Sequence, residues 1–300
     1  MTEMTAAVNG IEICYETFGD RDGPPLLLVM GLGAQMTTWD TEFCEGLADR
    51  GFFVIRFDNR DVGRSTKIDS EPINFIETFM RSRQGEPVTA PYTLTDMAAD
   101  AVGLLDHLDI LAAHVVGASM GGMIVQTIAI EHPERVLTLT SIMSTTGELD
   151  VGQATPDALQ RLLTRPPADR ESVIEYSVET SRVIGSPDLF DEERARERAA
   201  AAYDRCFFPV GIGRQLVGIV ASGSRADGLR NVRVPTLVIH GDQDPLVTPS
   251  GGRRTAELVP DAELLEIPGM GHDLPPSVWS QIIDAITKLA ARAVAAGGPA

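Results

Sequence analysis

The residues best suited to chemistry form the pattern G-x-S-x-G at 117–121, with Ser119 at its centre. The pattern follows the β-branched pair Val115-Val116 and precedes a long stretch of helical composition, so Ser119 is expected where a strand meets a helix. Glycines near the serine allow a sharp turn, because larger side chains would clash there. Such a turn lifts the hydroxyl clear of the sheet and aims the helix N-terminus at the reaction centre. We therefore predict that Ser119 is a nucleophile.

A serine hydroxyl is a poor nucleophile until a neighbouring base takes its proton. The base is expected in a loop at the carboxyl ends of the strands, after the acid in chain order. His272 fits this position, because it follows the last predicted strand within a Gly-Met-Gly-His turn. The other histidines are expected to be structural, two on strands and two on helices: His114, His240, His107 and His132.

The acid that orients the histidine is expected after the strand predicted at 236–240. Two aspartates compete there, Asp242 and Asp244. We favour Asp244, which stands before a proline where the chain turns away from the strand. Asp242 remains the alternative acid, and stabilisation of the turn would be its structural role. The acid would hold the imidazole tautomer and stabilise its cationic form.

The oxyanion of an acyl-transfer reaction needs two backbone N–H donors. One is expected from Met120, the residue after the nucleophile, and the other from Leu32 in the Met-Gly-Leu-Gly turn at 30–33. The glycines on either side of Leu32 let the backbone approach the substrate closely. The alternative for this segment is an ordinary glycine turn.

Flexible apolar side chains stand at or just beyond the predicted strand ends, where open α/β sheets place their ligands. They predict an adaptable pocket for an uncharged ester of small to medium size, and plain core packing is the equal alternative. A phenylalanine of the segment between two strands would add an apolar wall. The predicted lining consists of Met30, Gly31, Met143, Phe208 and Met270.

The elements that must position these residues alternate between strands and helices, which predicts a mostly parallel sheet with helices on both faces. An Asn9-Gly10 hairpin precedes the first parallel strand. The predicted strands are 26–30, 52–57, 114–118, 136–143, 236–240 and 263–267. The predicted helices are 37–50, 93–108 with Thr95 near its N-cap, 119–131 and 277–294.

Two segments interrupt this alternation. Residues 66–91 are too many for an ordinary loop, so we expect structure of their own there. Residues 145–232 lack strand patterns and contain helical stretches near 156–164, 171–183 and 191–206. We interpret 145–232 as a helical cap inserted into an α/β core formed by 1–144 and 233–300.

Composition excludes several classes of function. The 300 residues carry 25 basic against 43 acidic side chains, and this net charge of −18 argues against nucleic acids and anionic membrane surfaces as partners. Three scattered cysteines predict reduced thiols in a cytoplasmic protein: Cys14, Cys44 and Cys206. We see neither a signal peptide nor an apolar run that could span a bilayer. No pattern indicates an oligomeric state.

Together these residues resemble the α/β-hydrolase superfamily, whose nucleophile, acid and histidine follow the order seen in Ser119, Asp244 and His272. The segment DNRDVGRS at 58–65 resembles the D-x-R-G-x-G-x-S turn of that family. Asp61 stands where glycine is usual, and aspartate tolerates a left-handed backbone better than most residues.

The nearest resemblance within the superfamily rests on this DNRDVG variant, on MGLGA at 30–34 and on GASMGGM at 117–123. These segments are similar to the aclacinomycin methylesterase and mycobacterial lipase/esterase branch, over nearly the whole chain. The resemblance implies hydrolysis of carboxylic esters through an acyl-serine, without metal or cofactor. Met30 stands where many relatives have histidine, which makes the pocket more apolar.

Other functions remain alternatives on the same scaffold. Cofactor-free perhydrolases, lactonases and carbon–carbon bond hydrolases use the same triad. Epoxide hydrolases and dehalogenases are disfavoured, because those relatives carry aspartate where Ser119 stands. A small-molecule receptor with little turnover is the alternative from outside the enzymes, although an intact set of triad candidates argues against it.

Overall fold

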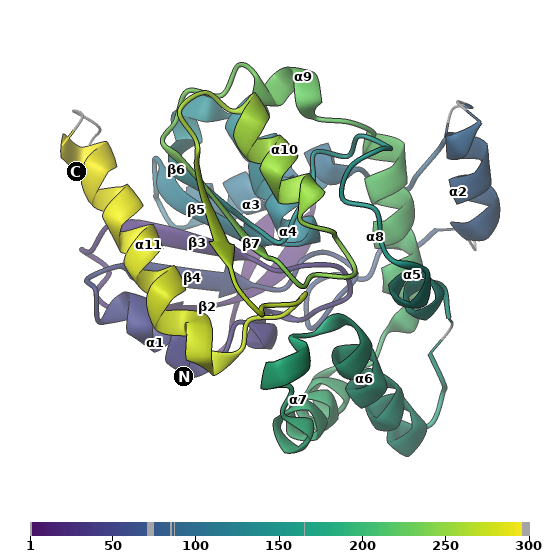
Figure 1. Ribbon diagram of the computed structural model, residues 1–300. Coiled ribbons are helices and arrows are strands. Elements are labelled where there is room, and N and C mark those ends of the chain that lie inside the picture. Colours follow the sequence, from purple (N-terminus) through teal and green to yellow (C-terminus); the bar gives the residue numbers. More distant parts are fainter. Residues whose placement is uncertain (1, 71–74, 85, 87, 165, 296–300) are drawn as a thin grey trace.

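The computed structural model describes residues 2–70, 75–84, 86, 88–164 and 166–295, and within these ranges eight strands form one sheet (Figure 1). Their order across the sheet is β1-β2-β4-β3-β5-β6-β7-β8. The first hairpin and the pair β2–β4 are antiparallel, and all other neighbours are parallel. The strands are β1 Met4–Val8, β2 Ile11–Phe18, β3 Pro25–Val29, β4 Phe53–Phe57, β5 Ala113–Ala118, β6 Val136–Ile142, β7 Thr236–Gly241 and β8 Glu263–Ile267.

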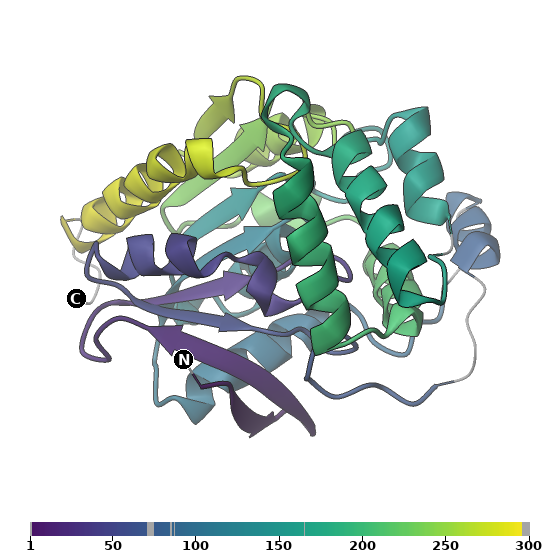
Figure 2. The same cartoon turned by 90° about the horizontal axis from the view of Figure 1, so that it is seen from below.

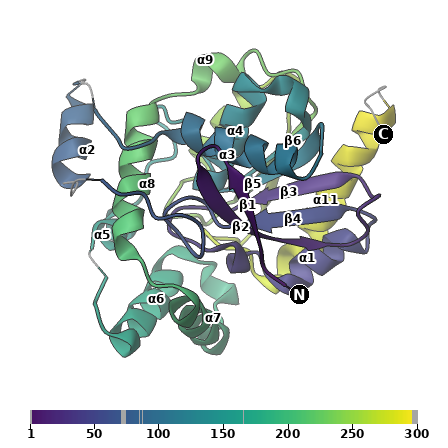
Figure 3. The same ribbon diagram turned by 180° about the vertical axis from the view of Figure 1, so that it is seen from behind.

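Helices cover both faces of the sheet because alternate residues of each strand point to opposite sides. In β3, Leu27 and Val29 pack in the core under helices α3 (Leu94–His107) and α4 (Met120–Glu131), which Figure 3 shows on that face. Leu26 and Leu28 pack instead under α1 (Thr41–Ala48) and α11 (Pro276–Ala295). The predicted fold class, a mostly parallel sheet between two helical layers, is confirmed.

The parallel strands point toward a group of helices that lies between β6 and β7 in the chain. Figure 2 shows these helices beyond the strand ends, on one side of the molecule. They are α5 Pro156–Leu163, α6 Arg170–Ile184, α7 Glu192–Arg205 and α8 Pro209–Ser222. The three predicted helical stretches correspond to α5, α6 and α7, whereas α8 was not predicted.

The remaining elements are short. Helix α2 (Phe75–Arg83) falls in the long segment for which structure was expected, and it lies beside α8 (Figure 1). Helices α9 (Ala226–Leu229) and α10 (Ser250–Leu258) flank the last strands. Three 3₁₀ turns complete the described elements: η1 Met36–Thr38, η2 Pro133–Arg135 and η3 Pro187–Leu189. No helix in the described ranges is both long and apolar enough to cross a bilayer.

Two helix starts differ from the prediction. The helix expected at 37–50 is divided into η1 and α1, with Asp40 as the N-cap of α1. Thr93, not Thr95, caps α3, because its backbone is extended at φ −123° and its N–H donates to the Asp96 carboxylate at 2.7 Å. The Thr95 hydroxyl instead donates to Glu131 at 2.8 Å.

The strand histidine His114 provides a test of this core. It is buried on β5, its Nδ1 lies 2.9 Å from the Thr138 hydroxyl, and burial lowers its pKa from 6.5 to about 4. The unfolded chain therefore binds a proton near pH 6.5 that the folded chain binds only near pH 4.

The free energy of unfolding should accordingly fall by roughly 2 to 3 kcal/mol between pH 7 and 4.5 through this one group. His114→Gln should remove that part of the pH dependence. Urea unfolding of both proteins across this range measures it, since all other titrating groups are shared. Two stability curves that stay parallel would contradict the burial of His114.

Candidate active site

Ser119 occupies a strained turn between β5 and α4. Its backbone has φ 56° and ψ −119°, a conformation that non-glycine residues rarely adopt. Two hydrogen bonds hold it there: the Ser119 N–H donates to the Ile142 carbonyl at 2.9 Å, and the Ser119 carbonyl accepts from the Ser144 hydroxyl at 2.8 Å. The hydroxyl therefore stands at the end of β5 beside the end of β6.

The glycines of the motif explain why this turn forms. A β-carbon on Gly117 would lie 2.1 Å from the Gly121 carbonyl oxygen, and one on Gly121 would lie 2.0 Å from the Val29 carbonyl oxygen. Both distances are far below van der Waals contact. Helix α4 can therefore begin against β3 and β5 only if these two positions lack side chains.

The structure brings the predicted base and acid to the predicted nucleophile. His272 Nε2 lies 3.0 Å from Ser119 Oγ, and His272 Nδ1 lies 2.7 Å from Asp244 Oδ2. His272 follows β8, Ser119 follows β5 and Asp244 follows β7. The arrangement can take a proton from the serine hydroxyl and stabilise the resulting imidazolium.

The loop that carries His272 is held by the helical segment between β6 and β7. The His272 N–H donates to the Ile184 carbonyl at 2.7 Å, and the Gly271 N–H donates to the Ser186 hydroxyl at 2.9 Å. Asp273 accepts from both the N–H and the hydroxyl of Ser186, at 3.0 and 2.5 Å. The imidazole is thus positioned by residues from outside the sheet.

Asp244 is buried, and its surroundings favour the ionised form. Oδ1 accepts the N–H groups of Leu246 and Val247, each at 2.9 Å. Burial by itself raises the pKa of Asp244, but the opposing effect of His272 and His240 is larger and lowers the pKa to about 2. At neutral pH this carboxylate is therefore available as the partner of His272.

Asp242 is placed differently from Asp244. It is exposed, and its carboxylate accepts the Gly269 N–H at 2.7 Å. This bond links the turns after β7 and β8. The geometry thus places Asp244 rather than Asp242 against the imidazole.

His240 is a member of the site that the sequence interpretation placed only in the strand core. It is buried on β7, with Nε2 2.7 Å from the Val247 carbonyl and 3.4 Å from Asp244 Oδ2. Because a carbonyl can only accept, Nε2 carries the proton, and this N–H also faces the carboxylate. The sequence carries no local signal for this contact, because a four-residue spacing brings side chains together on a helix and His240 lies on a strand.

The turn predicted to supply an oxyanion donor lies directly beside the nucleophile. A β-carbon on Gly31 would lie 3.1 Å from Ser119 Cβ and 3.6 Å from Ser119 Oγ. The Met30 carbonyl accepts the Asn59 side-chain amide at 2.9 Å, and Gly33 has φ 65°. Met120 is the first residue of α4, so its N–H has no partner within the helix.

Four of the five predicted pocket residues lie just beyond the ends of β3, β6 and β8, whereas Phe208 lies outside the sheet. Met30, Met143 and Met270 are buried among apolar residues of the core layer under α1 and α11. Phe208 is half-buried at the start of α8, with Arg214 and Lys67 each 5.8 Å from its ring centre. The methionine side chains therefore contribute to core packing in this structure.

The aspartate in place of glycine at position 61 has a clear structural reason. Asp61 has φ 68°, the left-handed conformation expected from the sequence. Its carboxylate accepts the Tyr92 hydroxyl at 2.7 Å and pairs with Arg214 at 3.1 Å. The side chain thus joins the core to α8, which glycine could not do.

Two of the three cysteines are held in the protonated form by burial. All three are free thiols, and burial raises the pKa of Cys14 and Cys44 to about 12. At neutral pH these two remain protonated and unreactive. Among the described residues, no group of three His, Cys, Asp or Glu side chains is placed to hold a metal ion.

Residues 24–276 match the family of the alpha/beta hydrolase fold, and the chain belongs to this family. It is 33% identical over 300 residues to rhodomycin D methylesterase DauP of a Streptomyces species, covering 92% of this chain and 94% of the relative. It is 25% identical to 3-oxoadipate enol-lactonase 2 of Acinetobacter baylyi, covering 95% and 96%.

Solved structures agree on the fold. The enol-lactonase of Burkholderia xenovorans matches with a TM-score of 0.73 at 22% identity, over 97% of this chain and 100% of that one. The resemblance to a methylesterase branch of the α/β hydrolases is therefore confirmed, and the protein is an enzyme of the hydrolase class.

The glycine requirement of the Ser119 turn can be tested by stability. Gly121→Ala should lower the free energy of unfolding by at least about 3 kcal/mol, because its β-carbon would overlap the Val29 carbonyl. Gly213→Ala in α8, where a β-carbon meets nothing within 4 Å, should be neutral or stabilising by up to about 1 kcal/mol. Urea denaturation midpoints measure both, and equal effects would refute the steric account.

Proposed function

We propose that the protein is a serine carboxylic-ester hydrolase that acts on a small to medium apolar ester through an acyl-serine intermediate. The observation that carries this proposal is the unbroken chain of contacts from Ser119 Oγ to His272 Nε2 and from His272 Nδ1 to Asp244. The methylesterase relative supports the same reaction class.

In the first half of the proposed reaction, Ser119 Oγ attacks the ester carbonyl while His272 takes its proton. The carbonyl oxygen becomes an oxyanion that the Leu32 and Met120 N–H groups stabilise. Asp244 remains ionised and stabilises the imidazolium. The tetrahedral intermediate then collapses, the carbon–oxygen bond to the alcohol breaks, and His272 returns the proton to the departing alcohol.

In the second half, His272 takes a proton from a water molecule, which attacks the acyl-serine carbonyl. The same two amides hold the second oxyanion. The bond to Ser119 Oγ breaks, His272 protonates the serine, and the carboxylic acid leaves. In each half His272 takes up one proton and returns it, so the protons balance and the mechanism calls on no cofactor or metal.

The substrate would lie between the core and a cap. We propose that residues 145–232 form this cap and that 1–144 with 233–300 form the core. Met30, Gly31, Met143, Phe208 and Met270 would line the pocket. The position of Gly31 against Ser119 and the apolar character of the other four support an uncharged acyl or alkyl group.

A lactonase is the second candidate, favoured by the similarity to enol-lactonases in both sequence and fold. The same attack on a cyclic ester opens the ring, and the alcohol stays attached to the acyl group. Rates on a linear ester and on a lactone of equal carbon number separate the two functions. Preference for the lactone would replace the first proposal by this one.

Ser119→Ala should lower the turnover of a p-nitrophenyl ester by several powers of ten, because the acyl-enzyme can no longer form. Mass spectrometry of the wild type after rapid acid quench should show one acyl group on Ser119. A fluorophosphonate should label the wild type and not the variant. Undiminished hydrolysis by the variant would refute the proposal, and an unlabelled wild type would favour a receptor.

The choice of acid is tested by a matched pair of variants. Asp244→Asn should lower kcat by about 10³- to 10⁴-fold, because the amide no longer stabilises the imidazolium. Asp242→Asn should stay close to the wild type, since an amide oxygen can still accept the Gly269 N–H. The reverse ranking of the two kcat values would assign the acid to Asp242.

A further inference from the structure

Helix α8 makes a hydrogen bond to the turn that lies beside the nucleophile. The Gln215 side chain is completely buried, and its Oε1 accepts the Gly33 N–H at 2.8 Å. Its Nε2 donates to the Arg60 carbonyl, also at 2.8 Å. One side chain from the segment between β6 and β7 thus spans two loops of the core.

The same helix makes a second contact with Gly33. A β-carbon on Gly33 would lie 2.8 Å from Cγ1 of Ile212, which precedes Gln215 by about one helical turn. The helix itself is fixed against the core, because a β-carbon on Gly211 would lie 2.1 Å from the Asp61 carbonyl oxygen. Arg214 adds an ion pair to the Asp61 carboxylate. Gly33 is therefore held by a helix that has little room to shift.

The other end of the turn is held from the core. The Asn59 side chain donates to the Met30 carbonyl at 2.9 Å, and both groups are buried. Leu32 lies between these two anchors, one peptide from Gly33 and two from Met30. An oxyanion donor is effective only when its N–H is fixed at about 2.7–3.1 Å from the developing charge. The anchors provide such fixation for the Leu32 peptide.

We propose that Gln215 is a positioning residue of the oxyanion hole: through Gly33 it fixes the Leu32 N–H that stabilises the transition state. This inference rests on the proposed esterase function. It makes one side chain of α8 part of the transition-state machinery without any contact to the substrate. Loss of the amide would leave the part-buried Gly33 N–H without its partner, and the turn would move to satisfy it.

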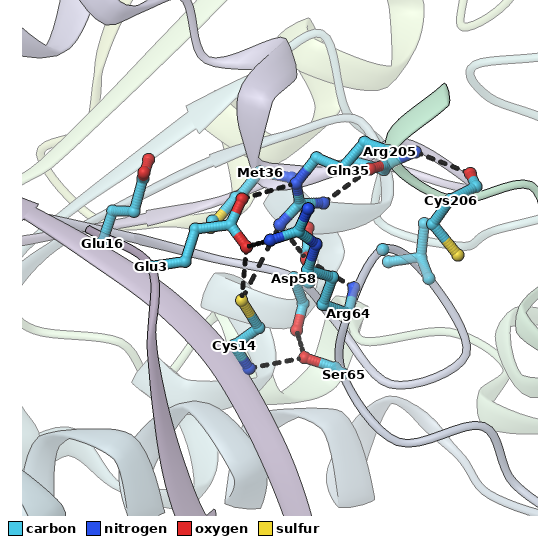
Figure 4. A network of polar contacts seen from close by, with 12 residues as sticks. Glu3, Cys14, Glu16, Gln35, Met36, Asp58, Arg64, Ser65, Arg205 and Cys206 are labelled. Atoms are coloured by element: carbon cyan, nitrogen blue, oxygen red, sulfur yellow. Dashed lines mark hydrogen bonds and ion pairs between the residues drawn. The ribbon is translucent and has the colours of Figure 1, made fainter. Parts of the chain in front are cut away.

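A second buried glutamine offers a matched control. The Gln35 side chain donates to the carbonyls of Ala202 and Cys206, at the C-terminus of α7, and accepts from Arg205 (Figure 4). It therefore joins the core to the same helical segment, close in sequence to Gly33. Within the described part of the chain, its side chain bonds to α7 and not to the turn at 30–33, so its loss should leave the Leu32 amide in place.

The experiment compares Gln215→Met and Gln35→Met with the wild type on an aryl ester and on its thionoester, in which sulfur replaces the carbonyl oxygen. Sulfur is a weak hydrogen-bond acceptor, so the ratio of the two kcat values reports the donors of the oxyanion hole. Gln215→Met should lower kcat on the ester about tenfold or more, with little change in KM. The ester-to-thionoester ratio should fall with it.

Gln35→Met should keep the wild-type ratio, even if its melting temperature drops. Gln215→Asn, which retains an amide that is too short to span both loops, serves as the second variant should Gln215→Met not fold. A wild-type ratio in a folded Gln215 variant would overturn the inference. So would an equal fall of the ratio in Gln35→Met.

Failure of this inference is distinct from failure of the proposed function. If Ser119→Ala abolishes hydrolysis and the Gln215 variants keep the wild-type ratio, only the role of Gln215 is refuted. If Ser119→Ala hydrolyses the ester like the wild type, the esterase mechanism itself is refuted.

Discussion

Helix α4 begins so close to the ends of β3 and β5 that neither Gly117 nor Gly121 has room for a β-carbon. This steric constraint determines where every other part of the site must lie. It forces Ser119 to a positive φ, which a backbone bond to Ile142 at the end of β6 and a bond from the Ser144 hydroxyl then stabilise. Strained backbone of this kind persists only where the surrounding structure over-determines it. Three strands and one helix meet at the serine, so the hydroxyl is fixed by the sheet rather than by a loop.

The charged groups near the serine are also fixed by the surrounding structure. Asp244 is the buried anion nearest to the imidazole, and two backbone N–H groups and the His240 N–H compensate its burial. It therefore keeps its charge in a site of low polarity, where, in the proposed mechanism, it would interact strongly with the imidazolium formed during attack. The overall charge of −18 has no such local role, because surface charges are screened over about 8 Å at physiological salt.

The positions of Ser119 and Asp244 could be predicted from the sequence, because residue types close in the chain specify the two turns that carry them. The glycines around Ser119 and the aspartate–proline turn at Asp244 each need particular residue types at short spacing. Helix α8 could not be predicted, because glycines at 211, 213 and 218 weaken the helical pattern. Gly211 proves to be required by the close approach to Asp61. The bond between Gln215 and Gly33 joins residues 182 positions apart, and no local pattern specifies such a pair.

The hydrogen bonds that the loop of His272 donates to Ile184 and Ser186 have a further consequence for attempts to alter selectivity. Replacing the segment between β6 and β7 by that of a relative would be intended to change only the substrate specificity. It would also remove the contacts that hold His272, the proposed base, and, through α8, those that hold the turn at Gly33. Grafts that retain Ile184, Ser186 and Gln215 and vary only the remaining surface can change selectivity while they keep the proposed chemistry intact.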